Sequence, residues 1–582
     1  MSEARKLPAA NWRRRAGYAV SPRAIIALAG MHRAVRRVRR GRAGHNRRFV
    51  AGELGRQRHL FDDIGGRSLE PQQRRAVVTD EDNTLVVAGA GSGKTLTIVG
   101  KVHYLVKARH VAPEAILPIS FTAASAESLR QRIAMPGIRP MTFHAFGLSV
   151  VQATEQRHPR IFDDSQLPEL LAGWVRFLTT RANSTYRDLL ADYLHLRSNG
   201  QAIDREQAAP FLSLCASVLP LVRARDGDVA SIRQLHRQAR PRRQAGSKGR
   251  TSQALHRRTD QFLMLLTPLL SLYERHLRRN GLIDFHEMIN RATAYIADGR
   301  YRCELEHVII DEFQDLSPDR YRLLRAIRQQ RPSVKFFCVG DDWQSIYRFA
   351  GSDIGLFRDF SYHFGATAVV HIDTTYRFGQ PMIGISSDFI TRSPNQTPKQ
   401  LKAPAGRPPT TCSVSRLGTK RDDTTALLAA LETLESAQDM TAASEVYIIG
   451  RFNFDYQRIS EVPGKLTPVQ RPDGPGFDYQ LATGSSLRLS FVTAHRAKGL
   501  EADFCIILNC NRGRHGFPAS QPEEPVLSLL LSSADDFEHG EERRLFYVAM
   551  TRARHHTVFI CDPERASPFI SEIEGLLSPP GK

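Results

Sequence analysis

The sequence predicts an α/β protein with doubly wound parallel sheets, and two observations carry this prediction. From about residue 67, short apolar runs rich in valine and isoleucine alternate with helix-like segments, as buried parallel strands and their covering helices do. A glycine-rich turn follows the first apolar run and precedes a helix-like segment, as in a phosphate-binding unit of such folds. The apolar runs, which we expect to be strands, are 84–88, 116–121, 307–310, 335–339, 369–372, 446–449, 504–508 and 557–560.

Composition and charge narrow the class of partner. The chain has 582 residues, enough for about three to five packing units at roughly 100–200 residues each. Its 41% of hydrophobic and 24% of charged residues exclude a wholly disordered chain, a collagen-like chain and a disulfide-rich miniprotein. Lysine and arginine total 81 against 60 acidic residues, which gives a formal net charge of +21. Such an excess favours a polyanionic partner, most often nucleic acid and less often an anionic membrane.

The cysteines and the apolar segments bear on cofactors and location. None of the seven cysteines sits in a C-x-x-C pair, so we expect a reducing compartment and no zinc or iron–sulfur cluster. No run of about 20 apolar residues occurs, so we expect no transmembrane helix and no membrane partner. The start of the chain lacks the pattern of a secretory signal, although its arginines leave an organelle transit peptide open. The expected location is the cytoplasm.

Two regions depart from the alternating pattern. Residues 1–66 form a basic N-terminal arm with arginine clusters at 13–15 and 33–48. This arm is either a solvated, partly helical extension or an auxiliary contact to nucleic-acid phosphates. Residues from about 150 to 280 contain helical patterns and few strand-like runs, so we expect a helical insertion there.

The glycine-rich turn is the strongest chemical signal in the chain. Its glycines allow backbone N–H groups to curl around phosphate oxygens at the N-terminus of the following helix. Lys94 can reach the β- and γ-phosphates of a nucleotide, and the Thr95 hydroxyl can bind Mg²⁺. The strict pattern begins with glycine, whereas alanine stands first here, a variant that some families accept. The residues of the turn are Ala88, Gly89, Ala90, Gly91, Ser92, Gly93, Lys94 and Thr95.

Two adjacent carboxylates, Asp311 and Glu312, follow the apolar run 307–310. Asp311 at the tip of a strand is placed to hold Mg²⁺, and Glu312 is then the candidate general base for the attacking water. An isolated Asp-Glu pair after a strand is usually only a helix cap, but its combination with the glycine-rich turn favours hydrolysis. The sequence therefore predicts that the chain binds and hydrolyses a nucleoside triphosphate.

A third block, residues 339–351, follows another expected strand and narrows the class further. With this block the chain resembles the UvrD/Rep-type superfamily 1 DNA helicases. The resemblance covers about residues 67–575, and within the family the sequence of the motifs is most similar to that of the helicase IV branch. Further blocks that match the family's motifs in order are 69–76, 121–122, 142–144, 283–285, 375–377, 493–501 and 541–554, and the blocks shared with the branch are 340–344, 347–353, 373–378 and 567–569.

The resemblance implies a role for each residue of the nucleotide site. ATP would bind between two motor domains, together with Mg²⁺. Arg377 and Arg552 would stabilise transition-state charge from the second domain, and Gln344 would sense the γ-phosphate. The adenine and the sugar would be held by Gln73, which reads the base, Tyr376, which stacks on it, and Glu501, which contacts the sugar side.

The resemblance also implies a surface that contacts single-stranded DNA. Phe121, Tyr347 and Phe349 would lie along the strand. Core packing is the alternative interpretation for each ring, because it is the usual fate of phenylalanine in such a fold. The other motif residues expected to contact DNA are Thr122, Thr142, His144, Thr493 and His495.

The implied fold is a pair of RecA-like P-loop motor domains, the first at 67–336 with the helical insertion and the second at 337–582. Three features depart from the family pattern. Ala350 and Leu96 stand where many members carry arginine, which weakens one expected polar contact at each place. The interval 377–493 is too short for the large subdomain that UvrD and Rep insert there.

The implied function is an ATP-dependent DNA helicase that moves on single strands in the 3′-to-5′ direction and unwinds tailed duplex DNA. Repair, recombination and replication are the processes in which such an activity serves. A nucleic-acid-stimulated ATPase that remodels protein complexes without separating strands shares every motif and stays an alternative. A non-enzymatic binding module with decayed motors is disfavoured, because Lys94, Asp311, Glu312, Arg377 and Arg552 are all present.

Overall fold

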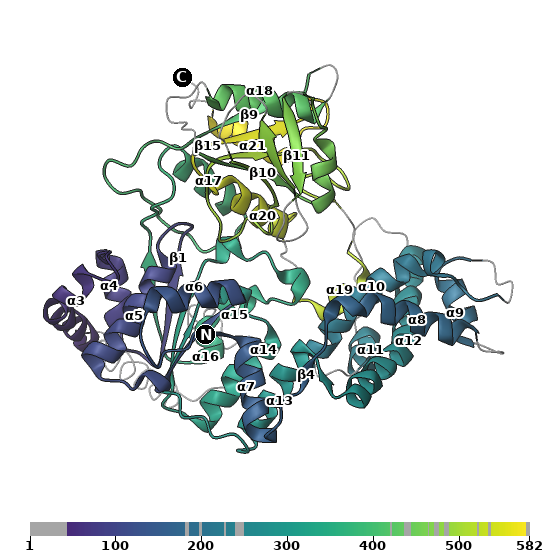
Figure 1. Ribbon diagram of the computed structural model, residues 1–582, viewed down its shortest axis with the longest axis horizontal. Helices are drawn as coiled ribbons and strands as arrows, with labels where there is room; N and C mark the ends of the chain where they lie inside the picture. Colours follow the sequence, from purple (N-terminus) through teal and green to yellow (C-terminus); the bar gives the residue numbers. More distant parts are fainter. Residues whose placement is uncertain are drawn as a thin grey trace, which may run out of the picture.

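The protein consists of two sheet-containing domains and a helical insertion. In the computed structural model these are the lower lobe, the upper lobe and the group of helices at the right (Figure 1). We call these parts the first domain, the second domain and the insertion. The structure describes residues 44–180, 185–196, 201–225, 229–238, 249–418, 422–435, 444–463, 465–470, 477–481, 488–520, 523–532 and 537–577.

The first domain is built on a six-stranded sheet with the order β3-β2-β6-β7-β1-β8, in which every pairing is parallel. All residues of β1, β2 and β6 are buried, as near-continuous apolar runs in a parallel sheet require. The strands are β1 (Asn83–Ala88), β2 (Ile116–Ser120), β3 (Met141–Thr142), β6 (His307–Ile310), β7 (Lys335–Gly340) and β8 (Thr367–Ile372).

Helices cover both faces of this sheet and form two separate hydrophobic clusters. One cluster gathers residues of α7, α13 and α14, and the other gathers residues of α3, α4, α5 and α6. Side chains of alternate strand positions point into each cluster, which confirms the doubly wound α/β arrangement. The helices are α3 (Arg58–Asp62), α4 (Pro71–Val78), α5 (Lys94–Arg109), α6 (Ala123–Ile133), α7 (Phe143–Glu155), α13 (Phe285–Ala297), α14 (Pro318–Gln330), α15 (Ile354–Arg358) and α16 (Phe360–Phe364).

The second domain has a seven-stranded sheet with the order β11-β12-β13-β10-β14-β15-β9. The strands from β13 to β9 pair in parallel, whereas β12 pairs antiparallel with both β11 and β13. The strands are β9 (Thr411–Arg416), β10 (Glu445–Gly450), β11 (Leu466–Gln470), β12 (Phe477–Leu481), β13 (Arg488–Thr493), β14 (Ala502–Ile507) and β15 (Ala553–Cys561), and the helices are α17 (Met382–Thr391), α18 (Asp423–Glu435), α19 (Pro525–Leu530), α20 (Gly540–Met550) and α21 (Pro568–Leu577).

The insertion is a helical bundle with its own hydrophobic core. Its helices leave and rejoin the first domain through a two-stranded parallel sheet of β4 and β5. Val526 and Leu530 of α19 are part of the same core, so a segment of the second domain's chain docks on the insertion. The elements are β4 (Arg160–Ile161), β5 (Leu282–Ile283), α8 (Leu167–Thr180), α9 (Thr185–Tyr193), α10 (Arg205–Ala224), α11 (Val229–Gln238) and α12 (Gly249–Asn280).

Short 3₁₀ helices sit at several strand ends and loops, and two of them carry residues expected at the site. Gln344 ends η6, and Phe349 is the middle residue of η7. The 3₁₀ helices are η3 (Pro113–Ala115), η4 (Asp164–Gln166), η5 (Phe313–Asp315), η6 (Asp342–Gln344), η7 (Arg348–Ala350) and η8 (Asn453–Arg458).

The structure moves the expected domain boundary at residue 336. Strand β7 begins at Lys335 and pairs with β1 and β6, and β8 at 367–372 pairs with the other side of β1. The chain therefore completes the first sheet before it enters the second, whose first strand begins at Thr411. A strand's sequence shows that it is buried, but it does not show which of two sheets it joins. The expected boundary at residue 336 therefore lies too early in the chain, because β7 and β8 belong to the first sheet.

The insertion is also narrower than the expected 150–280. Helix α7 continues to Glu155, and its residue Val150 is buried in the core of the first domain. The independent core of the insertion begins with Phe162 and includes Leu277 near the end of α12. Amphipathic helices of the domain and of the insertion look alike in sequence, because each simply buries one face.

The basic arm is not wholly separate from the first domain. Residues 44–56 are helical, and Glu53 accepts a 2.8 Å hydrogen bond from the buried Tyr104 hydroxyl of α5. Phe61 and Ile64 are buried in the same cluster as α5. The first domain thus includes residues from Val50 onward, and the arginine clusters expected at 13–15 and most of 33–48 lie outside the described residues.

Among the described residues, one helix is long and apolar enough by composition to cross a membrane, namely α10. Nearly half of its apolar window, 44%, is buried inside the insertion, and a core helix of this kind passes the same test. All seven cysteines are buried and unpaired, as expected for a reducing compartment.

Candidate active site and nucleic-acid interface

The phosphate-binding turn connects β1 to α5 and is covered by the segment 375–377. Gly91 and Gly93 have φ values of +72° and +78°, in the left-handed region that favours glycine. At Gly91 a Cβ would come within 2.6 Å of the Cβ of Arg377, so close packing requires glycine as well. The N–H of Tyr376 donates to the Gly91 carbonyl at 2.9 Å. The turn and this segment thus form one unit.

Gln73, the expected adenine reader, is bound to the phosphate-binding turn in this structure. Its amide donates to the Ser92 carbonyl at 3.1 Å and accepts from the Glu70 N–H at 3.0 Å, and the side chain is buried. The second bond belongs to the capping box that begins α4. Gln73 therefore positions the turn, and both of its polar atoms are engaged within the protein.

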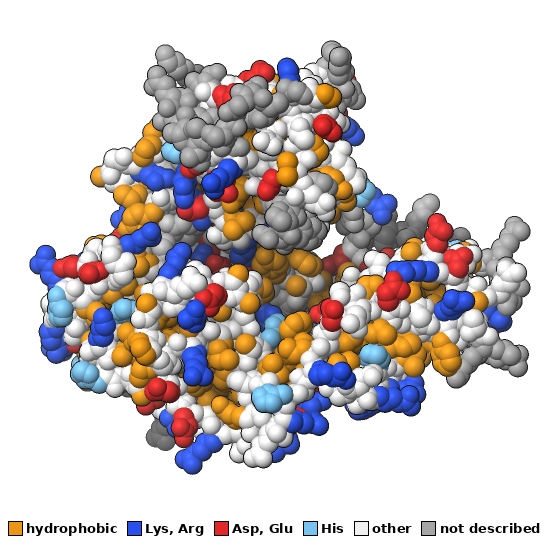
Figure 2. Space-filling model, viewed as in Figure 1, with side chains coloured by type: hydrophobic (Ala, Val, Ile, Leu, Met, Phe, Trp, Pro, Cys, Tyr) orange, Lys and Arg blue, Asp and Glu red, His pale blue; other side chains and the backbone are white. Residues whose placement is uncertain are grey.

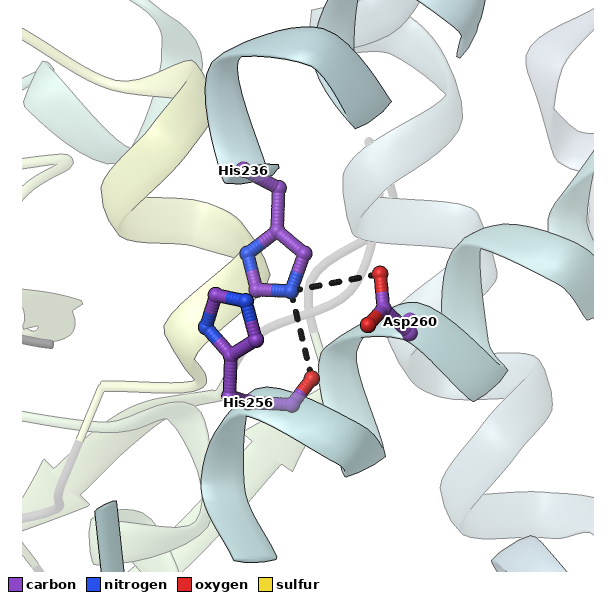
Figure 3. Close-up of side chains that lie close together, drawn as sticks. All are labelled: His236, His256 and Asp260. Atoms are coloured by element: carbon purple, nitrogen blue, oxygen red, sulfur yellow. Dashed lines mark hydrogen bonds and ion pairs between the residues drawn. The ribbon is translucent and has the colours of Figure 1, made fainter. Parts of the chain in front are cut away.

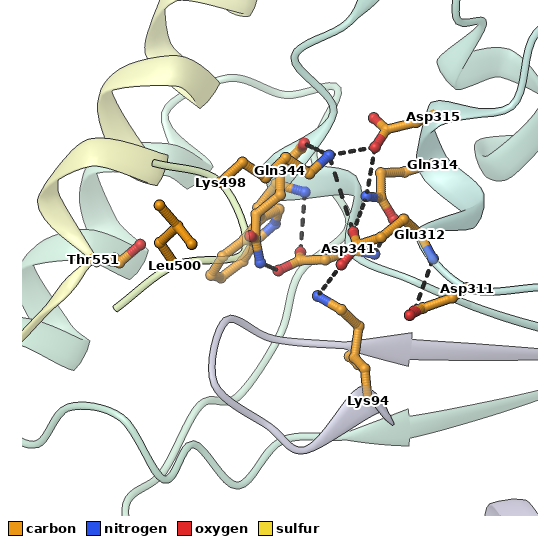
Figure 4. A network of polar contacts seen from close by, with 12 residues as sticks. Lys94, Asp311, Glu312, Gln314, Asp315, Asp341, Gln344, Lys498, Leu500 and Thr551 are labelled. Atoms are coloured by element: carbon orange, nitrogen blue, oxygen red, sulfur yellow. Dashed lines mark hydrogen bonds and ion pairs between the residues drawn. The ribbon is translucent and has the colours of Figure 1, made fainter. Parts of the chain in front are cut away.

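The expected acidic pair faces the turn from the next strand but one. Asp311 follows β6, and Glu312 has a φ of +48°, a sharp change of direction that turns its side chain toward the turn. The Lys94 ammonium lies 3.6 Å from Glu312 Oε1, and Gln314 donates to Glu312 Oε2 at 2.5 Å. Figure 4 shows Lys94 pointing from the turn at Glu312, with Gln314 on the other side of this carboxylate.

The two carboxyls of this pair differ in acidity. Burial raises the pKa of Asp311, and the adjacent charge of Glu312 raises it further. Burial also opposes ionisation of Glu312, but the ammonium groups of Lys94 and Lys498 outweigh it and hold its pKa below the usual range. Glu312 is thus ionised at neutral pH and able to accept a proton, which a general base requires.

Lys498, which the sequence argument did not single out, connects the two domains at this site. It lies in the loop after β13, and its ammonium binds the Asp315 carboxylate and donates to the Gln344 carbonyl at 2.8 Å. It also lies 3.9 Å from Glu312 Oε2. The network in Figure 4 therefore runs from the phosphate-binding turn to the second domain through a single lysine.

Gln344, the expected γ-phosphate sensor, donates its amide to Asp341 Oδ2 within the first domain. Asp341 also binds the buried ammonium of Lys399, which lies 2.7 Å from Asp342 Oδ1. The Asp341 N–H donates to Gln314 Oε1 at 2.8 Å. Gln344 is therefore held beside the acidic pair through a chain of hydrogen bonds that includes Gln314.

Arg377 and Arg552 lie together at the boundary between the domains. Arg377 donates to Glu501 Oε2 at 3.1 Å. Arg552 is fully buried, and its described hydrogen bonds go to neutral oxygens: the Val548 carbonyl at 2.7 Å, the Leu500 carbonyl at 3.1 Å and the Thr551 hydroxyl at 3.2 Å. Burial, and then the charge of Arg377, lower the pKa of Arg552 to about 9. Two adjacent guanidinium groups favour an anion between the domains.

The residues expected at the base and sugar lie beside this pair. Tyr376 lies in the segment 375–377 that covers the turn, and its side chain is 45% exposed, which leaves ring surface for stacking. Glu501 is engaged by two arginines, Arg377 and Arg554, and the latter lies 2.5 Å from Glu501 Oε1. Burial opposes ionisation of Glu501, but these partners lower its pKa to about 2.

The residues around the turn fit a triphosphate with Mg²⁺. The Ser92 hydroxyl is buried and has no hydrogen-bond partner among the described residues, so a polar group is missing there. Backbone N–H groups at the start of α5, together with Lys94, are the donors that phosphate oxygens take. The Thr95 hydroxyl and the Asp311 carboxylate are hard oxygen ligands of the kind that Mg²⁺ prefers.

A row of aromatic rings lies next to this network. The rings of Phe121 and Tyr347 are stacked, with centroids 5.6 Å apart and planes at 11°. Phe349 is 56% exposed and meets His495 edge-on at 5.2 Å. We call Phe121, Tyr347, Phe349 and His495 the aromatic row. The Lys498 ammonium lies 4.9 Å above the Tyr347 ring, so the aromatic row touches the nucleotide site directly.

The polar motif residues near the row have defined local roles. Thr122 and Thr142 are the N-caps of α6 and α7, and each accepts a backbone N–H at 3.1 Å. The Thr493 hydroxyl accepts from the Arg496 N–H at 3.3 Å. Burial lowers the pKa of His144 to about 4 and that of His495 to about 3, so both imidazoles are neutral at pH 7. These two side chains would not neutralise a phosphate.

A cavity of about 430 Å³ opens beside Phe349. Its walls come from the second domain and include Phe452, Thr493 and His495. The space-filling view shows a hollow where the second domain and the insertion face each other, and basic side chains spread over the whole visible face rather than gathered in one patch (Figure 2). The aromatic row therefore has free space on its exposed side.

Sequence reasoning missed three residues of the site, of which one lies within a recognised motif. Lys498 lies inside the block 493–501, which matches a family motif. Its position in that motif was a signal that the lysine has a role at the site. Arg320 in α14 places its guanidinium 4.6 Å from the centroid of Phe121. Lys399 reaches the site from a loop with no motif. Only the three-dimensional structure reveals the last two.

Comparison with known proteins agrees with this geometry. A model of the UvrD/REP helicase N-terminal domain matches residues 69–365, just over half of the chain, and one of the UvrD-like helicase C-terminal domain matches 480–562. DNA helicase IV of Escherichia coli is 29% identical over 547 residues, which cover 92% of this chain and 74% of that protein. ATP-dependent DNA helicase UvrD1 of Mycobacterium tuberculosis is 27% identical over 58% of this chain and 41% of its own length.

A probable DNA helicase of Mycoplasma pneumoniae is 24% identical over 511 residues, which cover 84% of this chain and 82% of that protein. The matched regions contain the phosphate-binding turn, the acidic pair, the aromatic row and Arg552, whereas Arg377 lies between them. The domains of this family are RecA-like, and the parallel first sheet and mainly parallel second sheet agree with that fold. The chain therefore belongs to the UvrD/REP helicase family and is an ATP-dependent DNA helicase.

Proposed function

We propose that the chain moves along single-stranded DNA in the 3′-to-5′ direction, driven by ATP hydrolysis, and separates tailed duplexes ahead of it. The observation that supports this most is the position of Lys498. One ammonium group binds Asp315 of the first domain, lies near Glu312 and covers the Tyr347 ring of the aromatic row. A change in the position or charge of the nucleotide would therefore shift Lys498, and Lys498 would transmit this shift to the aromatic row.

The chemistry at the phosphates follows from the residues around the turn. Lys94 and the N–H groups of α5 would bind the β- and γ-phosphates, and Thr95 with Asp311 would hold Mg²⁺. Mg²⁺ would supply charge neutralisation on the phosphate oxygens. Glu312, kept ionised by Lys94 and Lys498, would take the proton of the attacking water. Arg377 and Arg552 would place positive charge opposite the turn from the second domain.

The remaining nucleotide contacts depend on groups that are engaged in this structure. Tyr376 would stack on the adenine with its exposed ring, and Glu501 would face the sugar side. Gln73 and Gln344 would each exchange a bond within the protein, to Ser92 and to Asp341, for one to the nucleotide. This exchange would tie the position of the turn and of η6 to occupancy of the site.

The DNA grip would combine stacking with hydrogen bonding. Phe349 offers an exposed ring beside the cavity, and the stacked pair of Phe121 and Tyr347 would line the strand next to it. Thr122, Thr142 and Thr493 would reach the strand backbone as hydroxyl groups, and His144 and His495 as neutral rings. Base stacking on aromatic side chains is tolerant of sequence, which suits movement along DNA.

The direction, the location and the process rest on the family. We assign 3′-to-5′ movement, a cytoplasmic location and a place in repair, recombination or replication because the motifs of this chain resemble those of family members with these properties. The chain's net charge of +21 supports a polyanionic substrate.

Strand displacement on duplexes with a 3′ or a 5′ single-stranded tail tests this proposal. We expect displacement of the 3′-tailed substrate with ATP, none with a non-hydrolysable analogue, and none by Glu312→Gln, which keeps the ATP contacts but lacks the base. ATP hydrolysis stimulated by single strands without displacement of either substrate would instead establish a remodelling ATPase. Absence of hydrolysis by the wild type would leave only a binding module.

A further inference from the structure

Three metal-ligating side chains gather in the insertion, away from the nucleotide site. His236 lies on α11, and His256 and Asp260 lie on α12. One potential ligand atom from each residue lies within 4.8 Å of the other two. Figure 3 shows the two imidazoles one above the other, with the Asp260 carboxylate directed at the ring of His236.

Two packed helices hold these side chains together. His256 and Asp260 are four residues apart on α12, so they project from the same face of one helix. Val229 and Ile232 of α11 are buried in the core of the insertion, and this packing turns His236 toward α12, where it is also buried. The proximity therefore follows from backbone elements and not from a loop.

The contacts within the group bring the potential ligand atoms close together. His236 Nε2 lies 3.2 Å from the His256 carbonyl oxygen and 3.4 Å from Asp260 Oδ1. The two rings are stacked, with centroids 3.7 Å apart. Burial, and then the charge that His256 would carry, lower the pKa of His236. His236 is therefore neutral at pH 7, in the form that binds metals.

We propose that His236, His256 and Asp260 bind a divalent transition-metal ion of the zinc type, with water completing the coordination. Two imidazole nitrogens and one carboxylate oxygen form a donor set that suits Zn²⁺ and its neighbours, whereas Mg²⁺ and Ca²⁺ prefer oxygen alone. Three protein ligands leave a coordination position for water. The Asp260 side chain is 50% exposed, which gives the ion a path from solvent.

Metal binding requires two local changes. One nitrogen of His256 moves closer to Asp260, from a position in which the potential ligand atoms already lie within 4.8 Å of one another. His236 binds through Nε2, the nitrogen nearest Asp260, and gives up its contact with the His256 carbonyl oxygen. A ligating nitrogen carries no proton, so the affinity for the ion falls as the imidazoles become protonated.

The ion would fix a surface that the second domain uses. Helices α11 and α12 both contact α19, the docked segment of the second domain's chain. A metal bridge between them would hold this docking surface in one arrangement. The expectation of no zinc cluster rested on the spacing of the cysteines, and no cysteine takes part here. Ligands from two helices leave no compact sequence motif.

Co²⁺ titration of the full chain, untagged and freed of metals with a chelator, tests the proposal. Four-coordinate Co²⁺ bound to nitrogen and oxygen ligands absorbs visible light, and Zn²⁺ should displace it. We expect one Co²⁺ per chain in the absence of nucleotide. His256→Gln and Asp260→Asn should each weaken the affinity by at least about 100-fold, because even loss of an outer partner of a ligand costs 10–100-fold.

His195→Gln is the matched control, since His195 is an exposed histidine of the same insertion. It should bind Co²⁺ like the wild type, and the melting temperatures of all metal-free variants should agree if the fold is intact. Unchanged Co²⁺ binding by both His256→Gln and Asp260→Asn would overturn the proposal. So would a signal that vanishes only in Asp311→Asn, because the ion would then occupy the nucleotide site.

Discussion

Lys498 belongs to the second domain but binds groups of the first, which makes it the most informative single residue of the site. Its ammonium is paired with Asp315, whose side chain is 1% exposed, and it also contacts the Gln344 carbonyl. Burial raises the pKa of Asp315 to about 6, although Lys498 pulls it down. The pair is thus a buried ion pair at the boundary between the two domains.

Replacing Lys498 with methionine should loosen this boundary. A buried charge that loses its partner costs about 3–5 kcal/mol, so the melting temperature and the DNA-stimulated ATPase of Lys498→Met should both fall. The double variant Lys498→Met with Asp315→Asn removes the orphaned charge and should regain most of the melting temperature. A double variant that melts no higher than Lys498→Met would show that the pair does not carry this energy.

The aromatic row separates a stacking role from a packing role. Phe349→Ala should weaken binding of single-stranded DNA by roughly 5- to 150-fold, because stacking of a base is worth about 1–3 kcal/mol. Its melting temperature should stay unchanged, because the ring is 56% exposed. Tyr362→Ala is the control, since Tyr362 is 86% exposed on α16. DNA affinity that drops equally in both variants would contradict a specific role for Phe349.

At the residue scale, the sequence predicts those contacts whose positions are determined by a local motif. The approach of Lys94 to Glu312 could be anticipated, because a strand, a turn and a helix start determine where these side chains lie. The bonds of Gln73 to the turn and of Gln344 to Asp341 could not, since they depend on neighbours distant in sequence. Arg320 and Lys399 were missed for the same reason.

Among the elements, α19 has the most unusual position. This six-residue helix comes from the second domain's chain, but Val526 and Leu530 are buried in the core of the insertion. Just beyond it, the Ser532 carbonyl accepts from Arg348 of η7 at 3.0 Å. The segment 523–532 thus touches the second domain, the insertion and the first domain, and it can pass movement of the second domain to the insertion.

Leu530→Ala should undock this segment. A buried leucine cut to alanine typically costs 2–5 kcal/mol, and a short helix has few other contacts to retain it. We expect faster amide hydrogen exchange in α10 and α12, with basal ATP hydrolysis unchanged. Ser528→Ala, at an exposed position of the same helix, is the matched control. Equal exchange in the two variants would mean that α19 is not held by this core.

Strand β6 carries a buried histidine that should make the fold sensitive to acid. His307 begins the strand, and burial, followed by the charge of Lys101, lowers its pKa to about 3. In the unfolded chain a histidine titrates near 6.5, so the unfolded state binds the extra proton first. The contribution of His307 to stability is therefore present above pH 6.5 and is lost as the pH falls toward 3.

The melting temperature of the wild type should accordingly fall as the pH drops from 6.5 to 4. His307→Gln removes the titrating group, so its melting temperature should depend less steeply on pH over this range. His195→Gln, at an exposed position, should keep the wild-type slope. Parallel slopes for His307→Gln and the wild type would show that other groups dominate acid unfolding.

At the element scale, the burial of a strand was easier to predict than the sheet to which the strand belongs. All eight apolar runs expected to be strands lie on strands of the structure, because burial in a parallel sheet demands apolar side chains on both faces. Seven strands were missed: β3, β4 and β5 have only two residues each, and β9, β11, β12 and β13 are polar on one side or lie at the edge. The assignment of β7 and β8 to the first sheet depends on long-range pairing, which no local pattern encodes.

Considered as a whole, the molecule places one nucleotide site between two domains and lets each domain contribute charge. The phosphate-binding turn, Lys94 and the acidic pair come from the first domain, and Lys498, Arg377 and Arg552 come from the segment that leads into the second domain and from the second domain itself. Hydrolysis should therefore require both parts to be closed on the nucleotide. The net charge of +21, with basic side chains spread over the face seen in Figure 2, then favours DNA as the partner.

Steady-state ATP hydrolysis by Arg377→Ala at saturating single-stranded DNA tests this composite site most directly. Arg416→Ala, on the edge strand β9 and exposed, is the matched control. An arginine that stabilises transition-state charge is worth about 10³–10⁵ in rate, so we predict a loss of that order in Arg377→Ala, with ATP and DNA still bound. A rate for Arg377→Ala equal to that of Arg416→Ala would contradict a site shared between the two domains.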